Sequence, residues 1–396
     1  MTKIHVVGGV YWEKCAFPYW NELYGSAGRA AAALAARGCH VVLHTILSKK
    51  DRQHVELALL SDEIEVLSQE RETEIEFDYL HCLSTPKIHP VSNIKSVQGL
   101  ELDEGVVVKF GMLECNPKVM ADTCVYDPQS PHSPILFSKS GSKAKRLAIV
   151  ANKSEILRMA DSTDVDKAVN FLLKSEKAEV VLVKNGLYGA TVFVDGRKEE
   201  IPAFKARDIF TIGSGDVFVA AFAYAWALMG KHAIEAGRYA SLSVAEYVES
   251  RTFPIGNFDA VIGSGREAVV PKGGRIYLAG PFREIGQRML IDDAREQLYR
   301  LGMSVFSPIH DVGPGSANQV VQQDLAGIRE CDAVFALLNG SSPGTVFEVG
   351  YAIALGKPVY CAAQNMRDVD LKLPIGAGAH YHEDYVSALH QLAWRT

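Results

Sequence analysis

Residues 211–224 read Thr-Ile-Gly-Ser-Gly-Asp-Val-Phe-Val-Ala-Ala-Phe-Ala-Tyr, a turn of small residues that runs directly into an apolar segment. Gly213, Ser214 and Gly215 allow a ligand to approach the backbone, and the N–H groups at the start of the following helix favour an anion. Asp216 is unusual at such a place. It can be a base that takes a proton from a hydroxyl during phosphoryl transfer, or a cap of the helix. The segment alone leaves both readings open.

Alternating strands and helices surround this segment, which predicts an α/β protein with parallel sheets covered by helices. The expected elements are strand 4–7, helix 27–36 and strands 41–45, 180–183 and 192–194, followed by the helix over 218–228. Residues 63–76 are expected to form an exposed edge strand, and the basic segment 137–146 a solvated loop. Turn-formers at 263–266 and 271–274 predict a domain over 1–263, a linker over 264–274 and a second domain over 275–396.

The second domain is expected to be a complete, small doubly wound fold. Its predicted elements are strand 275–280, helix 287–301, strand 304–307, helix 320–329, strand 333–338, helix 346–355 and strand 358–361.

Composition excludes several classes of protein. The 396 residues contain 41 Lys and Arg against 47 Asp and Glu, a net charge of −6 that gives no general attraction to nucleic acid. Residues 217–230 are too short to cross a bilayer, and the N-terminus lacks the pattern of a signal peptide, so we expect no membrane contact and a cytoplasmic location. The 7 cysteines are spread without a C-x-x-C pair and predict neither disulfides nor a zinc site.

Four motifs of residues 1–263 occur together in order. They are Gly25-Ser26 before a helix, Asp127-Pro128-Gln129, Asn152-Lys-Ser-Glu155, and Gly213-Ser214-Gly215-Asp216. This part of the chain resembles the ribokinase-like, or PfkB, family of sugar and nucleoside kinases, which lack a G-x-x-x-x-G-K-[ST] loop as this chain does. The resemblance implies a ribokinase-like αβα fold that uses Mg²⁺ with ATP.

The same resemblance assigns roles to residues. Asp216 would be the catalytic base, with Gly213, Ser214 and Gly215 as the anion hole. Asn152 and Glu155 would organise Mg²⁺ indirectly, through its waters. Gly25, Ser26 and Glu13 would bind the sugar, although Glu13 replaces the usual Asp and Phe210 replaces an Asp near a monovalent cation. A degenerate kinase that only binds a nucleoside or nucleotide is the alternative.

In the second domain, four segments are expected to meet at the carboxyl ends of parallel strands, where such folds bind ligands. They are 276–283, 307–310, 323–324 and 344–351. Glu348, read as lying in the first turn of a helix, can attack an anomeric carbon and hold the glycosyl group covalently, or it can simply favour the helix start.

Residues 275–396 resemble the nucleoside 2-deoxyribosyltransferase family in the segments Ile-Tyr-Leu-Ala-Gly-Pro-Phe (276–282), 324–334 and 344–359. The resemblance implies a Rossmann-like or flavodoxin-like fold, with Gly280 and Gly344 in the site and no cofactor. It identifies Glu348 as the nucleophile, Tyr277 as the hydroxyl that positions it, and Asp324 as the carboxylate that binds the sugar and assists the leaving base.

Ser342 stands where transferases of this family have an Asp. The branch that hydrolyses deoxynucleoside 5′-monophosphates has Ser there and an Arg at the place of Arg283, and both serve the phosphate. His310 is predicted to touch the base. The second domain is therefore predicted to be a nucleotide N-glycosidase.

The whole chain is predicted to be a bifunctional enzyme that phosphorylates a nucleoside or sugar hydroxyl and cleaves nucleoside 5′-monophosphates. One alternative is a transferase that exchanges bases between deoxynucleosides. Another is a ligand sensor that controls a nucleotide-depleting glycosidase. The expected partners are nucleosides, nucleotides and ATP, and the family resemblance implies a homodimer or a higher homo-oligomer.

Overall fold

A computed structural model of the chain describes residues 3–58, 64–91, 94–130, 133–253, 256–340 and 342–395. They form two compact units, one of Met1–Ala206 with Phe210–Val269 and one of Arg207–Ile209 with Val270–Thr396. The short excursion Arg207–Ile209 into the second unit had no signal in the sequence. None of the helices in the described ranges has the length and apolarity needed to cross a membrane.

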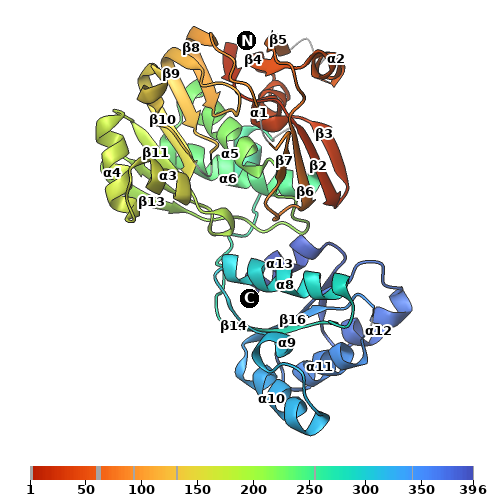
Figure 1. Cartoon of the computed structure of the whole chain (residues 1–396). Helices are drawn as coiled ribbons and strands as arrows, with labels where there is room; N and C mark the ends of the chain where they lie inside the picture. The colour runs from red at the N-terminus through yellow and green to blue at the C-terminus, as the bar shows by residue number, and fades with distance from the viewer. Residues whose placement is uncertain are drawn as a thin grey trace. The chain divides into compact units, whose positions relative to one another are not determined.

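The first unit is built on a nine-stranded sheet (Figure 1). In spatial order the strands are β13 (Arg197–Ile201), β12 (Ala190–Val194), β11 (Val180–Lys184), β10 (Lys143–Asn152), β9 (Lys118–Asp127), β8 (Glu101–Phe110), β1 (Lys3–Val7), β4 (His40–Leu47) and β5 (Ile64–Glu70). All neighbours from β11 to β5 are parallel, whereas β12 and β13 pair in antiparallel fashion at one edge. This confirms the predicted α/β class, with β5 as the expected edge strand.

Helices cover both faces of this sheet. One layer contains α1 (Gly25–Ala35), α5 (Ser214–Ala223) and α6 (Ala233–Ser250), which pack against one another, and α3 (Lys153–Met159) and α4 (Val165–Ser175) pack on β10 and β11. The remaining helices are α2 (Lys49–Ala58) and α7 (Phe258–Ile262). The predicted apolar helix after Gly213 is therefore real, and it continues beyond Ala223 as a single π-helical turn over Tyr224–Leu228.

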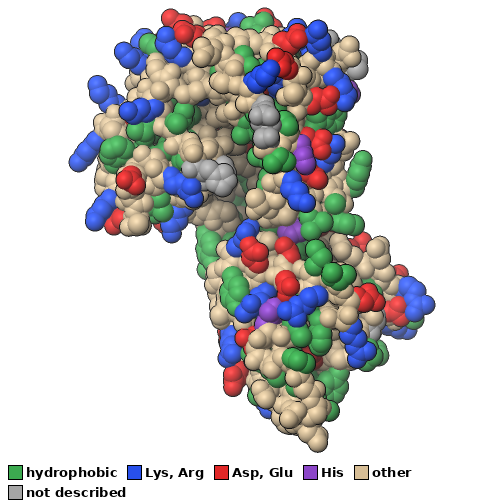
Figure 2. Space-filling model, in the orientation of Figure 1, with side chains coloured by type: hydrophobic (Ala, Val, Ile, Leu, Met, Phe, Trp, Pro, Cys, Tyr) green, Lys and Arg blue, Asp and Glu red, His purple; other side chains and the backbone are tan. Residues whose placement is uncertain are grey.

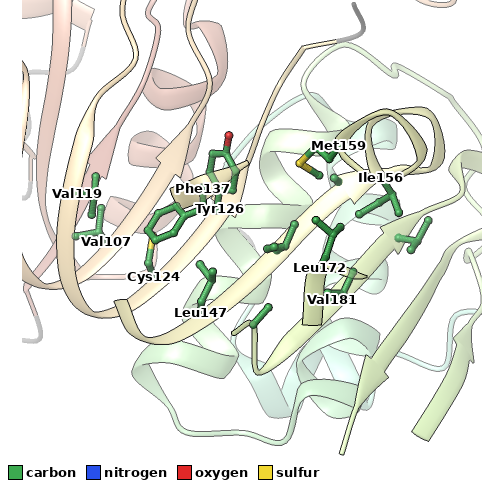
Figure 3. Packing of buried hydrophobic residues seen from close by; sticks show 14 of the residues in the cluster. Val107, Val119, Cys124, Tyr126, Phe137, Leu147, Ile156, Met159, Leu172 and Val181 are labelled. Atoms are coloured by element: carbon green, nitrogen blue, oxygen red, sulfur yellow. The ribbon is translucent and has the colours of Figure 1, made fainter. Parts of the chain in front are cut away.

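A hydrophobic core fills the space between the sheet and the helices α3 and α4. Ile156 and Met159 of α3 and Leu172 of α4 pack against Leu147 and Val181 of the sheet (Figure 3). Side chains of this size stabilise the fold by roughly 1.5–3 kcal/mol each when fully buried.

The prediction of a solvated loop over 137–146 is wrong. Phe137 is buried in the same core, and β10 begins at Lys143. The run of Ser and Lys residues masks the buried Phe137 and a strand whose first four side chains are exposed or half-buried.

A second, four-stranded sheet of the first unit was not predicted. Its order is β3 (Trp20–Leu23), β2 (Trp12–Phe17), β6 (Glu76–His81) and β7 (Lys87–His89). Its sequence signal is weak because its strands are short and carry charged residues. The sheet contributes Glu13 to the site described below.

The second unit contains a five-stranded, wholly parallel sheet of order β15 (Ser304–Phe306), β14 (Arg275–Ala279), β16 (Ala333–Leu337), β17 (Val359–Ala362) and β18 (His380–His382). Its helices are α8 (Ile285–Arg300), α9 (Pro308–Asp311), α10 (Ala317–Glu330), α11 (Pro343–Ala354), α12 (Asp368–Gly376) and α13 (Tyr385–Ala393). The predicted doubly wound fold is confirmed, with β18, α12 and α13 added at its C-terminal end.

Charged side chains of both signs are interspersed over the visible face of each unit (Figure 2). This agrees with the small net charge of −6. Ligand recognition must therefore come from individual sites.

Candidate functional sites

The first candidate site lies at the carboxyl edge of the sheet in the second unit. Tyr277 belongs to β14, and Glu348 lies on α11, which follows β16. The buried Tyr277 hydroxyl donates a hydrogen bond of 2.8 Å to Oε1 of Glu348, and its ring stacks on Phe306 at 5.6 Å between centroids. The predicted nucleophile and its positioning hydroxyl are therefore in direct contact.

One detail of the sequence reading needs correction. Helix α11 begins at Pro343, so Glu348 falls in its second turn, and the first turn contains no acidic residue. A carboxylate at that place gains little from the helix start, because the effect fades within the first turn. Glu348 is therefore not explained as a favourable residue of the helix N-terminus.

The electrostatics of this pair suit a poised carboxylate. Burial raises the pKa of Glu348 to about 7, the hydrogen bond from Tyr277 acts in the opposite direction, and the charge of Asp324 adds to the increase. The pKa of Tyr277 is itself raised, first by burial and then by Glu348, so the phenol stays protonated and continues to donate.

Asp324 of α10 is the second carboxyl group of the site. Its Oδ1 is buried and has no hydrogen-bond partner within the described part of the chain, and burial raises its pKa. An unsatisfied buried oxygen is costly, so this oxygen is expected to accept a hydrogen bond from a water molecule or a ligand.

The remaining predicted residues of this unit have different surroundings. Gly280 follows β14, where an added Cβ would lie 3.2 Å from Cβ of Leu337, whereas an added Cβ at Gly344 would lie 3.9 Å from Oγ of Ser342, an ordinary van der Waals contact. Arg283 is exposed and takes part in no ion pair among the described residues. Ser342 is the N-cap residue of α11, and its side chain makes no capping hydrogen bond.

His310 is more constrained than predicted. Its Nδ1 lies 3.0 Å from Oγ of Ser307 and its Nε2 2.9 Å from Oδ1 of Asp292. Both ring nitrogens therefore already have protein partners, so a contact with a base would have to replace one of them or use the ring face.

The second candidate site surrounds Asp216 in the first turn of α5, whose N-cap is Gly213 with a φ of 78°. Asp216 is buried, its Oδ2 accepts from Nη1 of Arg29 at 3.2 Å, and its Oδ1 accepts from Nε2 of Gln129 at 3.0 Å. The carboxylate does not cap the helix with its side chain. Burial raises the pKa of Asp216 to about 6, although Arg29 opposes the increase.

The residues around this carboxylate form a connected polar network. Gln129 also donates to Asp127, at 3.2 Å, and accepts from Oγ of Ser26, at 2.9 Å. Lys184 of β11 forms an ion pair with Asp127, and an added Cβ at Gly215 would lie 3.5 Å from its ammonium. Lys184 was missed by the sequence analysis because a lone Lys at a strand end has no signature.

Glu13 of β2 forms an ion pair with Arg29, and its contact with a sugar stays a prediction. Both of its carboxylate oxygens accept hydrogen bonds from Arg29, which is fully buried. Gly25 has a φ of 55°, and an added Cβ would lie 2.6 Å from the carbonyl oxygen of Gly9, so this turn requires glycine.

Asn152 and Glu155 form a capping box at the start of α3. The two oxygens of Glu155 accept from the backbone N–H groups of Ser130 and Asn152, each at 2.9 Å. Within the described ranges no group of three or more His, Cys, Asp or Glu side chains is arranged to hold a metal ion. The role of this motif toward Mg²⁺ stays a prediction.

The two units thus combine a buried Asp at a helix N-terminus, typical of phosphoryl-transfer sites, with a Tyr–Glu pair typical of glycosyl-transfer sites. Family comparisons agree with this division. The model of the pfkB family carbohydrate kinases matches residues 67–252, and that of nucleoside 2-deoxyribosyltransferase matches residues 276–387. The chain therefore joins a kinase-like domain to a nucleoside deoxyribosyltransferase-like domain.

A solved kinase structure supports the fold of the first unit. A microbiome-derived acarbose kinase, Mak1, aligns with a TM-score of 0.50 and 12% identity over 66% of this chain and 98% of that chain. Phosphofructokinase-2 from Escherichia coli in complex with potassium aligns with a TM-score of 0.48 and 15% identity, again over 66% and 98%. No significant match is found among curated proteins.

Proposed function

We propose that the second unit hydrolyses the N-glycosidic bond of a nucleoside 5′-monophosphate. The observation that carries this proposal is the 2.8 Å hydrogen bond from Tyr277 to Glu348, together with the buried Oδ1 of Asp324, which lacks a hydrogen-bond partner among the described residues. A carboxylate aimed by a phenol is a suitable nucleophile for an anomeric carbon.

In the first step, an oxygen of Glu348 forms a bond to C1′ of the sugar, and the electron pair of the N-glycosidic bond leaves with the base. Asp324, whose pKa is raised by burial, supplies the leaving base with a proton. In the second step, water attacks C1′ and gives a proton to Asp324, which the first step left ionised. The ester bond to Glu348 breaks, and the sugar phosphate is released. A free base in place of water would give the transferase reaction instead.

Tyr277→Phe provides a test of how Tyr277 acts. The hydrogen bond from Tyr277 lowers the pKa of Glu348, so its loss is expected to move the acidic limb of the kcat/KM profile upward from about pH 7. We expect a decrease in rate of about 10-fold or more at pH 7, because less nucleophile is ionised and the carboxylate is less well oriented. Base release measured from pH 5 to 9 checks this, with the exposed Tyr299→Phe as the control. An unshifted limb would contradict the role given to Tyr277.

Recognition of the phosphate is assigned to Arg283 and Ser342. The exposed guanidinium of Arg283 has no ion pair among the described residues, and the hydroxyl of Ser342 makes no capping hydrogen bond, so both suit an anion. Each charge-assisted bond is worth about 1.5–3 kcal/mol. Arg283→Gln is expected to raise KM for a monophosphate by about 10- to 100-fold and to leave any cleavage of the free nucleoside unchanged. Steady-state kinetics on both substrates check this, with Arg300→Gln on α8 as the control. An equal effect on both substrates would contradict phosphate recognition.

For the first unit we propose transfer of the γ-phosphoryl group of Mg-ATP to a nucleoside or sugar hydroxyl, with Asp216 as the base. Its burial, its pKa of about 6 and its place in the first turn of α5 support this role. Asn152 and Glu155 would act on Mg²⁺ of the substrate through waters. The two activities would form a relay in which the kinase-like unit makes the monophosphate that the second unit cleaves.

A sensor is the second candidate for the first unit. It is favoured by one observation, which is that both oxygens of Asp216 are already hydrogen bonded to protein groups. In that case a nucleotide would change the glycosidase rate without being turned over. Measuring the amounts of ATP and nucleoside before and after the reaction distinguishes this outcome from phosphoryl transfer.

A further inference from the structure

The turn before Asp216 is where the resemblance to the kinase family implies a nearby monovalent cation. The family commonly has an Asp near that ion, and this chain has Phe210 in its place. Phe210 is fully buried, and the centroid of its ring lies 4.9 Å from that of Trp20. Asp208, the nearest carboxylate upstream, belongs to the second unit, where it lies 3.2 Å from Nε2 of His382. A hydrocarbon ring therefore replaces the charged oxygen ligand that a cation would need.

A positive charge of the protein already lies beside this ring. The guanidinium carbon of Arg251 is 5.0 Å from the centroid of Phe210, within the range of a cation–π contact. Arg251 is the C-cap residue of α6, and the preceding turn of this helix accepts the backbone N–H of Phe210 at the carbonyl oxygen of Val248, at 2.9 Å. The C-terminal end of a helix favours a cation. Arg251 therefore supplies at this end of α6 the kind of charge that a bound ion would bring.

The rest of the turn is also held by groups of the protein. The hydroxyl of Thr211 donates to the carbonyl oxygen of Cys82 at 2.7 Å. The carbonyl oxygen of Thr211 accepts from the N–H of Ser214 at 3.1 Å, and that of Ile212 accepts from the hydroxyl of Tyr247 at 2.9 Å. Backbone carbonyl oxygens are typical ligands of alkali cations. Here these two oxygens already have donors, so the turn keeps its shape through its own contacts.

We propose that the first unit works without a monovalent cation, because Phe210 and Arg251 occupy the place that the family resemblance gives to the ion. This inference rests on the proposed kinase function, whose anion-hole turn it concerns. The C-terminal end of α6 fixes the turn instead, with Arg251 packed on Phe210 and Tyr247 hydrogen bonded to Ile212. A turn that is preorganised in this way needs no ion to present its N–H groups to a phosphoryl group.

Potassium chloride and tetramethylammonium chloride at equal ionic strength test the proposal. Both salts screen charges equally, but the organic cation cannot be bound by a ring of oxygen ligands. Calorimetric titration of the full chain with Mg-ATP is expected to give a Kd that agrees within about 3-fold between the two salts. Tighter binding in potassium by more than this factor would overturn the proposal.

A double variant tests the assignment of the place to these two residues. Phe210→Asp combined with Arg251→Gln restores the carboxylate and removes the competing positive charge. Its affinity for Mg-ATP is expected to become at least about 5-fold higher in potassium than in tetramethylammonium, because an ion that binds the active fold now contributes to it. Equal affinities in the two salts would show that Phe210 and Arg251 do not stand in the place of an ion.

Phe204→Asp combined with Arg238→Gln is the matched control. Phe204 is also buried, and the guanidinium carbon of Arg238 lies 5.2 Å from its ring centroid. This pair is expected to lose stability without gaining a dependence on potassium. If both double variants responded to potassium alike, the response would come from destabilisation, and the assignment would be wrong.

The inference and the kinase function fail in different ways. If the wild type binds no ATP in either salt and transfers no phosphoryl group, the kinase function fails. Thermal unfolding of the wild type then decides the inference, since an ion that binds only the folded chain raises the unfolding midpoint. Equal midpoints in the two salts would support the inference, and a higher midpoint in potassium would overturn it.

Discussion

Glu348→Gln is expected to abolish base release from nucleoside 5′-monophosphates, with a decrease of at least about 10³-fold, because the amide cannot form the glycosyl ester. The control is Glu296→Gln on α8, whose carboxylate is exposed and pairs with Arg300. Mass spectrometry of enzyme mixed with substrate would also lose the covalent adduct. A variant with more than about a tenth of the wild-type rate would contradict the nucleophilic role.

The same variant is expected to be more stable than the wild type. Glu348 ionises near pH 7 in the folded chain and near 4.5 when unfolded. Between these values the unfolded chain binds fewer protons, so rising pH lowers the free energy of unfolding. A pKa difference of this size lowers the free energy of unfolding by about 3 kcal/mol. Partial exposure of the carboxylate to solvent reduces this loss to roughly 1–3 kcal/mol. Urea unfolding of the second unit at pH 5 and pH 8 should show that the advantage of Gln grows with pH, and an equal advantage at both would contradict the electrostatic cause.

Asp216→Asn is expected to stop the ATP-dependent release of base from free nucleosides, by about 10²-fold or more. The cleavage of monophosphates should be unchanged, because that chemistry belongs to Glu348 in the other unit. In the wild type, transfer should fall as the pH drops below about 6, where Asp216 becomes protonated.

Asp122→Asn is the control for this experiment, since Asp122 is exposed and pairs only with Lys145 among the described residues. Product analysis with and without ATP distinguishes the outcomes. If Asp216→Asn left the ATP-dependent conversion of nucleosides unchanged, this result would contradict the relay. A loss of monophosphate cleavage as well would show that the substitution had damaged the whole chain.

The sequence predicted best the strands whose residues are continuously apolar and the helices whose apolar residues are periodic. The strand at Arg275–Ala279 and the helix at Ile285–Arg300 lie within two residues of their expected bounds. The short strands around Glu13 were missed because their alternation of charged and apolar residues is weak and their stability depends on packing against the rest of the unit.

Among the site residues too, some have a signal in the sequence and others do not. The pairing of Tyr277 with Glu348 follows from motifs at the ends of neighbouring strands, which a parallel sheet brings together. Arg29 had no signal in the sequence. It contacts Glu13, Asp216 and Tyr247, which are distant in sequence and carry no shared local pattern.

The relay, in which the first unit makes the monophosphate that the second unit cleaves, is tested most directly by one experiment. The purified chain is incubated with a panel of nucleosides and their 5′-monophosphates, each with and without Mg-ATP, and the products are resolved by chromatography and mass. The account predicts base released from monophosphates alone, and from nucleosides only when ATP is present. Release from free nucleosides without ATP, with a new nucleoside formed when a second base is added, would contradict it in favour of a transferase. Cleavage of monophosphates without any phosphorylation would contradict the relay and leave the first unit as a sensor.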